Sequence, residues 1–151
     1  MRIQEARVIG PVGETTPLFE LRVDTKTELR LDLSKMSFIT SVGVKNWIAW
    51  NLKIPASSRL SLIDCPFVII NQINTVHGFL PAGSEVKSFY APFVCEKCGA
   101  EASHRLELGV HYDYVPVGHR HLLPEFPCPK CGEPLEPDFD PARALRFMER
   151  G

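Results

Sequence analysis

Residues 29–44 read LRLDLSKMSFITSVGV, and their pattern changes from that of a strand to that of a helix. Leu29, Leu31 and Leu33 alternate with charged residues, which is typical of a strand with one buried face. After residue 41 the apolar side chains recur at the spacing of a helix with one buried side. The stretch therefore predicts a strand that is followed directly by a helix over residues 41–52.

Shorter patterns on either side complete a first domain, which we expect over residues 1–92. Alternation of apolar and polar residues predicts strands, and proline and glycine limit a second helix. The additional predicted elements are strands at residues 3–9, 18–23, 60–63 and 86–90 and a helix from residue 64 to residue 78. Strand–helix–strand connections imply a mixed sheet of four to five strands with helices on one face, in a fold of the α/β (α+β) class.

The composition is that of an ordinary globular protein. The chain has 151 residues, of which 44% are hydrophobic and 23% charged, and its net charge is -1. This balance gives no electrostatic footprint for nucleic acid or an anionic membrane. No apolar run approaches the roughly 20 residues that span a bilayer, and the N-terminus lacks the pattern of a secretory signal. We therefore expect a cytoplasmic location, where paired cysteines serve as metal ligands or redox groups.

Two Cys-x-x-Cys-Gly sequences stand in the last third of the chain, at residues 95–99 and 128–132. The two-residue spacing brings both sulfurs of such a knuckle onto one ion, and the glycine permits the turn that aims backbone N–H groups at the thiolates. Two knuckles supply four ligands, which leaves no coordination position for water or substrate. The sequence therefore predicts one structural zinc ion bound by Cys95, Cys98, Cys128 and Cys131.

This arrangement resembles a zinc ribbon over residues 93–135. Two other interpretations of the same cysteines stay open, namely a rubredoxin-like iron site and a redox-active dithiol. We expect the second domain to occupy residues 93–151, with strands of a hairpin at residues 103–110 and 111–117. A short helix capped by Asp140 is expected near the C-terminus.

Histidines close to the second knuckle provide an alternative chemistry. His119 and His121 are expected to be surface residues, but together with Asp113 or Glu125 they could form a metal-dependent catalytic site. A nucleic-acid-binding zinc ribbon is the other alternative. The net charge of -3 over residues 93–151 argues against it, because seven basic residues there face ten acidic ones.

Residues 29–44 resemble the central motif of STAS domains, the anti-sigma factor antagonist family. That family has a strand ending in an Asp-Leu-Ser type sequence, an apolar Phe-Ile or Phe-Met pair, and Asp-Ser-Ser-Gly-Leu at a helix start. The likeness covers about residues 15–92. Thr40 replaces the usual aspartate, and Val42 replaces the second serine.

The resemblance places Ser41 on the serine that kinases of that family phosphorylate. A phosphate there would be stabilised by the helix N-terminus, yet it would add about two negative charges to a contact surface. Alternatively, Ser41 only caps the helix. The possible partner-binding residues are Thr40, Ser41, Val42, Gly43 and Trp50. Trp50 belongs to this set only if it is exposed, since core packing is the other explanation of a tryptophan at the edge of the apolar stripe.

The sequence contains no Gly-rich phosphate loop, His-Glu-x-x-His or Gly-x-Ser-x-Gly motif. We therefore expect a non-enzymatic module of bacterial regulatory signalling. The resemblance implies partner switching, with a kinase or an anti-sigma-type regulator as the protein partner.

Overall fold

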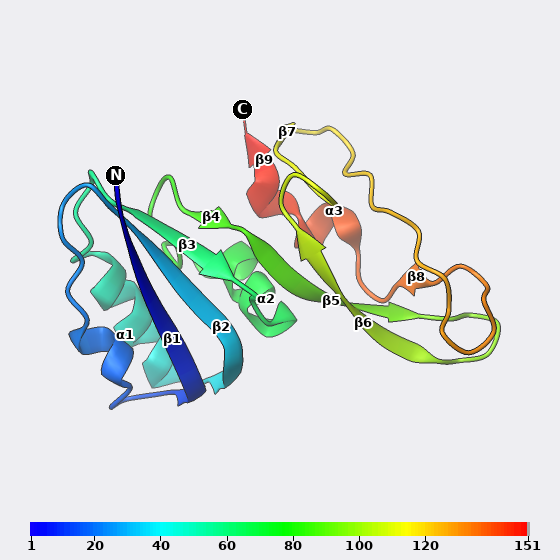
Figure 1. The fold of residues 1–151 in the computed structure, drawn as a ribbon, viewed down its shortest axis with the longest axis horizontal. Helices are drawn as coiled ribbons and strands as arrows, with labels where there is room; N and C mark the ends of the chain where they lie inside the picture. Colours follow the sequence, from blue (N-terminus) through cyan, green and yellow to red (C-terminus); the bar gives the residue numbers. More distant parts are fainter. Residues whose placement is uncertain (151) are drawn as a thin grey trace.

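A computed structural model describes residues 1–150, the last of them by its backbone alone (Figure 1). In chain order the elements are β1 (Arg2–Val12), η1 (Pro17–Glu20), β2 (Thr27–Ile39), α1 (Ser41–Asn51), β3 (Arg59–Ile63), α2 (Phe67–Thr75), β4 (Glu85–Val86), β5 (Ser88–Val94), β6 (Glu101–Glu107), β7 (Val115–Pro116), β8 (Glu136–Pro137), α3 (Pro141–Ala144), η2 (Arg146–Met148) and β9 (Glu149–Arg150). The η elements are 3-10 helices.

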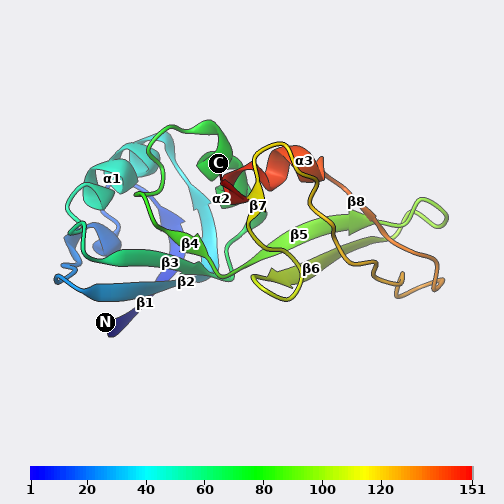
Figure 2. The same ribbon diagram turned by 90° about the horizontal axis from the view of Figure 1, so that it is seen from above.

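The first half of the chain forms a four-stranded sheet in the order β1-β2-β3-β4. Every pairing in this sheet is parallel. The expectation of a mixed sheet is therefore wrong. Because the strands follow one another across the sheet in one direction, right-handed crossovers place α1 and α2 on the same face. Figure 2 shows both helices on that side. The α/β class and the one-sided helices are therefore as predicted.

The core lies between this sheet and its helices. Leu29, Leu31 and Leu33 of β2 are fully buried, as their alternation predicts. They share one apolar cluster with Trp47 of α1 and Ile70 of α2. The spacing of apolar residues thus correctly identified the inner face of the central strand.

The strand predicted at residues 18–23 is wrong. Residues 17–20 form η1, which belongs to the crossover between the parallel strands β1 and β2. Its Leu18 is buried in the core, and the indole nitrogen of Trp50 donates a hydrogen bond to the carbonyl oxygen of Leu21 at 3.0 Å. The apolar residues of this segment pack against α1. Their spacing along the chain is also that of a strand, so the sequence alone could not distinguish the two.

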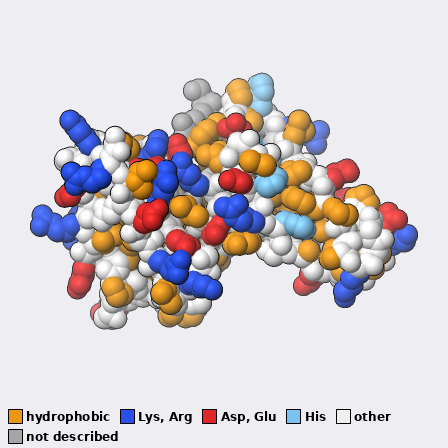
Figure 3. Space-filling view, viewed as in Figure 1, with side chains coloured by type: hydrophobic (Ala, Val, Ile, Leu, Met, Phe, Trp, Pro, Cys, Tyr) orange, Lys and Arg blue, Asp and Glu red, His pale blue; other side chains and the backbone are white. Residues whose placement is uncertain are grey.

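Ionised side chains occupy the other face of the sheet, where Figure 3 shows basic and acidic residues side by side. Glu28 lies among them and is only 4% exposed. Its carboxylate accepts hydrogen bonds from Arg30 at 3.1 Å and Arg59 at 3.2 Å, and the Lys87 ammonium lies 3.8 Å away. Burial acts to raise the pKa of Glu28, but these cations outweigh it and hold the pKa below its usual value.

Replacing this carboxylate should destabilise the protein and weaken its response to acid. Glu28→Gln is expected to lower the free energy of unfolding by about 2 kcal/mol at neutral pH, because three cations lose their shared partner. Since the folded-state pKa is depressed, the wild type holds this stabilisation above pH 4.5 and loses it as the pH falls through the folded-state value. Urea unfolding of both proteins from pH 7 to pH 3 measures the difference.

The exposed Glu5, on the same face of the neighbouring strand, provides the control. Glu5→Gln should change the free energy of unfolding by less than about 0.5 kcal/mol. Equal effects of the two substitutions, or a Glu28→Gln variant that keeps the full acid sensitivity of the wild type, would contradict this role of Glu28.

The second sheet is continuous with the first. After a single residue β4 leads into β5, which pairs antiparallel with β6 on one side and β8 on the other. At its start β5 also bridges back to the end of β3, through Cys65 and Phe89. The boundary expected at residue 92 falls inside β5, so one strand carries the chain from the helix-covered sheet to the cysteine knuckles. The hairpin of β5 and β6 replaces the one expected from residues 103–110 and 111–117.

The C-terminal segment folds back onto the helices of the first sheet. As predicted, the Asp140 side chain caps the short helix α3, accepting a hydrogen bond from Ala142 N at 3.1 Å. Asn74 of α2 then donates to the carbonyl oxygen of Ala144 at 2.7 Å and accepts from Phe147 N at 3.2 Å. These two hydrogen bonds hold the terminal segment beside α2. The second sheet is therefore connected to the first sheet through β5 and to α2 through the segment that follows β8.

Candidate metal centre

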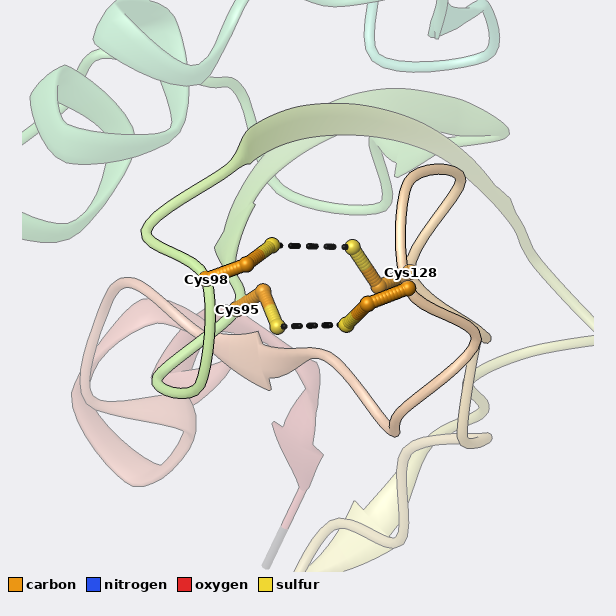
Figure 4. A group of neighbouring side chains, drawn as sticks. Cys95, Cys98 and Cys128 are labelled. Atoms are coloured by element: carbon orange, nitrogen blue, oxygen red, sulfur yellow. Dashed lines mark hydrogen bonds between the residues drawn. The ribbon is translucent and has the colours of Figure 1, made fainter.

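The two cysteine knuckles meet at the end of the second sheet (Figure 4). Cys95 and Cys98 lie in the turn between β5 and β6, and Cys128 and Cys131 lie in the loop before β8. Since β5 pairs with both β6 and β8, the sheet itself brings the two turns together.

The two knuckles have the same local geometry. In the first, Gly99 N donates to the carbonyl oxygen of Cys95 at 2.7 Å, and in the second, Gly132 N donates to that of Cys128 at 2.9 Å. Both glycines have positive φ, 77° and 78°, a conformation that favours glycine. The sequence predicted this role of the glycines from the repeated Cys-x-x-Cys-Gly pattern.

The four sulfurs are arranged as a tetrahedral ion requires. The Sγ atoms of Cys95 and Cys131 are 3.5 Å apart, those of Cys98 and Cys128 are 3.6 Å apart, and all four lie within 4.8 Å of one another. A tetrahedron with Zn–S bonds of about 2.3 Å has sulfur–sulfur edges of about 3.8 Å. The four cysteines therefore form a possible metal-binding site whose size fits an ion bound by four thiolates.

Backbone N–H groups favour the thiolate form that binds metal. Those of Cys131 and Lys130 lower the pKa of the Cys128 thiol to about 6. In the first knuckle, the N–H of Cys98 is the main cause of a lowered pKa at Cys95. Because a thiolate and not a thiol is the ligand, these hydrogen bonds favour metal binding at Cys95 and Cys128. At Cys98 and Cys131 a backbone N–H also acts to lower the pKa, but burial and the contacts with the other sulfurs, that of Cys95 foremost, outweigh it and raise the pKa.

Four thiolates also decide what the centre can do. With a tetrahedral ion bound they would complete its coordination, so that the ion would hold the two turns together and offer no position to a substrate. The residues that would hold the ion are the four cysteines alone.

The histidines near the second knuckle do not join this group. His119 is exposed and His121 is half-buried, and burial lowers the pKa of His121. Among the described residues, the four cysteines are the only set of three or more ligand-type side chains close enough to hold an ion. Within the part of the chain that the structure describes, neither histidine therefore belongs to a set with Asp113 or Glu125 that is close enough to hold an ion. The fifth cysteine, Cys65, is fully buried as a small core residue, as expected.

The start of α1 differs by one residue from the expectation. Thr40 is the N-cap, and its hydroxyl accepts a hydrogen bond from Gly43 N at 3.0 Å. Ser41, predicted as the cap, is the first residue of the helix and is exposed. The prediction that Ser41 caps the helix is therefore wrong, and the cap belongs to the neighbouring hydroxyl.

Gly43 and Trp50 are buried, so neither contributes to the surface at this end of α1. Gly43 packs against the end of β1, where a Cβ atom would lie 2.3 Å from the carbonyl oxygen of Val12. Trp50 is 2% exposed and stacks edge to face with Trp47 in the core, which excludes the exposed Trp50 needed for partner binding. The exposed residues here are Thr40, Ser41 and Val42.

One surface residue was missed in the sequence. Phe38, two residues before the cap, is 52% exposed, and Val42 in the first turn is 48% exposed. In the sequence Phe38 belongs to an apolar pair with Ile39, which suggests a buried strand end. Its exposure could have been foreseen only from the length of β2, which runs past the end of β3.

No helix among the described residues is long and apolar enough to cross a bilayer. Comparison of the chain with models of known protein families, with curated proteins and with solved structures gives no match.

Proposed function

We propose that this protein is a non-enzymatic binding module of bacterial regulatory signalling, held together at one end by a structural zinc ion. Its contact surface is the start of α1 with the preceding turn, here called the α1 surface and defined by Phe38, Thr40, Ser41 and Val42. The partner is a protein, of the kinase or anti-sigma-regulator class that the resemblance to STAS domains suggests.

The observation that carries this proposal is an exposed serine between two exposed apolar side chains. Phe38 and Val42 leave about half of their surface open to solvent, and Ser41 stands between them in the chain. Exposed apolar side chains of this size are typical of the centre of a protein interface. The Thr40 hydroxyl is occupied by Gly43 N, whereas the Ser41 side chain is exposed and available to a partner or a kinase.

A negative charge at Ser41 should prevent binding without unfolding the module. Asp is favoured in the first turn of a helix, because the free N–H groups and the helix dipole stabilise its charge. Ser41→Asp is therefore expected to keep the fold while weakening partner affinity at least about tenfold, since the charge would be buried in the interface. Wild-type and variant baits in a lysate of the source bacterium identify the partner, and titration calorimetry with the purified partner measures the affinity.

The matched control is Ala49→Asp, which places the same charge on the exposed side of α1 two turns further along. This variant should bind with wild-type affinity. A partner that binds Ser41→Asp and wild type equally would contradict a contact at the α1 surface. Loss of binding in both aspartate variants would show that the contact extends along the helix instead.

A further inference from the structure

The four cysteines of the metal centre differ in their exposure to solvent. Cys98 and Cys131 are exposed, whereas Cys95 and Cys128 are buried. Two sulfur–sulfur contacts each join the Sγ atom of an exposed cysteine with that of a buried cysteine of the opposite knuckle. These contacts are 3.5 Å between Cys131 and Cys95 and 3.6 Å between Cys98 and Cys128 (Figure 4). Each pair thus consists of one cysteine that is open to solvent and one that is buried.

An exposed lysine precedes each of the two exposed cysteines in the chain. Lys97 and Lys130 each stand between the two cysteines of a knuckle, and both are exposed. Lys97 also forms an ion pair at 3.2 Å with Glu133, which follows the second knuckle. Exposure to solvent is a condition under which cysteine thiolates react with oxidants.

We propose that the four-cysteine centre is an oxidation site, at which a hydroperoxide forms the disulfides Cys95–Cys131 and Cys98–Cys128 and thereby releases the zinc. This inference goes beyond the proposed binding function and does not depend on the identity of the partner.

The chemistry balances as two identical two-electron oxidations. In each pair the exposed thiolate attacks one oxygen of hydrogen peroxide, so that the O–O bond breaks, a sulfenic acid forms and a proton completes the departing water. The buried thiolate then attacks the sulfenic sulfur, the S–O bond breaks, and a second proton completes another water. For the whole centre, two peroxides and four protons give two disulfides, four waters and a free Zn²⁺ ion.

The released state differs from the zinc state in geometry. Zinc holds cross-knuckle sulfurs at the edge length of a tetrahedron, while a disulfide requires about 2.05 Å between them. Both knuckles must therefore move together, and β8 begins only five residues after Cys131. The oxidised protein keeps the two turns linked but changes the end of the second sheet.

The test uses the full zinc-loaded chain, freed of thiol reductants and treated with excess hydrogen peroxide. A chromogenic chelator records zinc release, and mass spectrometry after trypsin digestion without reduction identifies the disulfides. Since trypsin cleaves after Lys97 and Lys130, it places the four cysteines on separate peptides. We expect loss of the single zinc equivalent per chain, together with the pairs Cys95–Cys131 and Cys98–Cys128.

Cys65→Ser is the matched control, because Cys65 is fully buried outside the centre. It should release zinc at the wild-type rate and form the same two disulfides. Disulfides within each knuckle, oxidation to sulfinic acid without disulfides, or retention of zinc under excess peroxide would each overturn the proposal. Partner binding plays no part in these readouts, so they fail or succeed independently of the α1 surface.

Discussion

Cys128→Ser is expected to abolish zinc binding and to unfold the end of the second sheet. Structural zinc contributes about 10–16 kcal/mol of apparent binding free energy in small zinc modules, because ligand binding and folding are linked. The loop from residue 117 to residue 135 contains no helix or strand. Contacts such as the stacking of Phe126 on His104 hold part of it on the second sheet, and we expect the metal to order the knuckle itself. Hydrogen exchange should show rapid exchange over residues 95–135, while amides of β2 and β3 remain protected.

A matched substitution separates the loss of metal from the loss of a buried thiol. Cys65→Ser makes the same chemical change at a fully buried position, where the Sγ atom already lies 3.6 Å from the carbonyl oxygen of Pro66. That variant should keep one zinc ion per chain and the protection of residues 95–135. If Cys128→Ser retained zinc, or if its knuckles stayed protected without metal, the centre would not be the element that orders this region.

Gly43→Ala should destabilise the protein by about 3 kcal/mol, although alanine is the better helix former by about 1 kcal/mol in an open helix. A Cβ atom at residue 43 would lie 2.3 Å from the carbonyl oxygen of Val12 and 3.0 Å from a side-chain carbon of Ile39. Backbone atoms cannot move aside cheaply, and the same carbonyl oxygen accepts the hydrogen bond from Thr40 N at 2.9 Å. Any shift of α1 therefore also breaks the junction between β1 and the helix cap.

Gly13→Ala provides a control, for which we expect a change in stability of the opposite sign. A Cβ atom there would meet only the Thr40 hydroxyl, at an ordinary 3.7 Å. Alanine at such a site should stabilise the protein by about 0.4–1 kcal/mol, because it restricts the unfolded chain. Thermal and urea unfolding of the two variants measure both effects. Destabilisation of similar size in both, or a stabilised Gly43→Ala, would show that α1 does not pack this closely on β1.

The sequence predicted the parts of this molecule in which residue type and spacing have one meaning. Two Cys-x-x-Cys-Gly turns can combine into one site at any distance along the chain. The cysteine cluster could therefore be predicted without knowing the fold. The alternation of Leu29, Leu31 and Leu33 likewise gave the buried face of β2, because a period of two belongs to strands alone.

Other features depend on partners that are distant in the chain. Phe19, Leu21 and Val23 alternate with charged residues as in a strand, yet they lie beside Trp50 of α1. No local pattern distinguishes these two environments. The partner of β6 was missed because the first knuckle itself closes the hairpin with β5. At the start of α1 two adjacent hydroxyls suit an N-cap equally, and only the approach of β1 selects Thr40.

The burial of Trp50 shows the same limitation at a candidate site. Its position at the edge of the apolar stripe fits both a core residue and an exposed contact residue. Its indole nitrogen binds the Leu21 carbonyl in the crossover before β2, a segment that the sequence analysis assigned to a strand. The wrong strand at residues 18–23 and the wrong exposure of Trp50 therefore have the same cause, namely that the contact between this segment and α1 cannot be seen in the sequence.

X-ray absorption spectroscopy at the zinc edge tests the central claim most directly, that four cysteines form a closed zinc centre. For the protein purified under reducing conditions, we predict one zinc ion per chain, with four sulfur neighbours at about 2.3 Å and no lighter ligand. A first shell that contains nitrogen or oxygen would instead indicate a ligand such as His119 or His121 and an open position. An iron edge in place of zinc, or a protein folded at residues 95–135 without any metal, would also contradict the account.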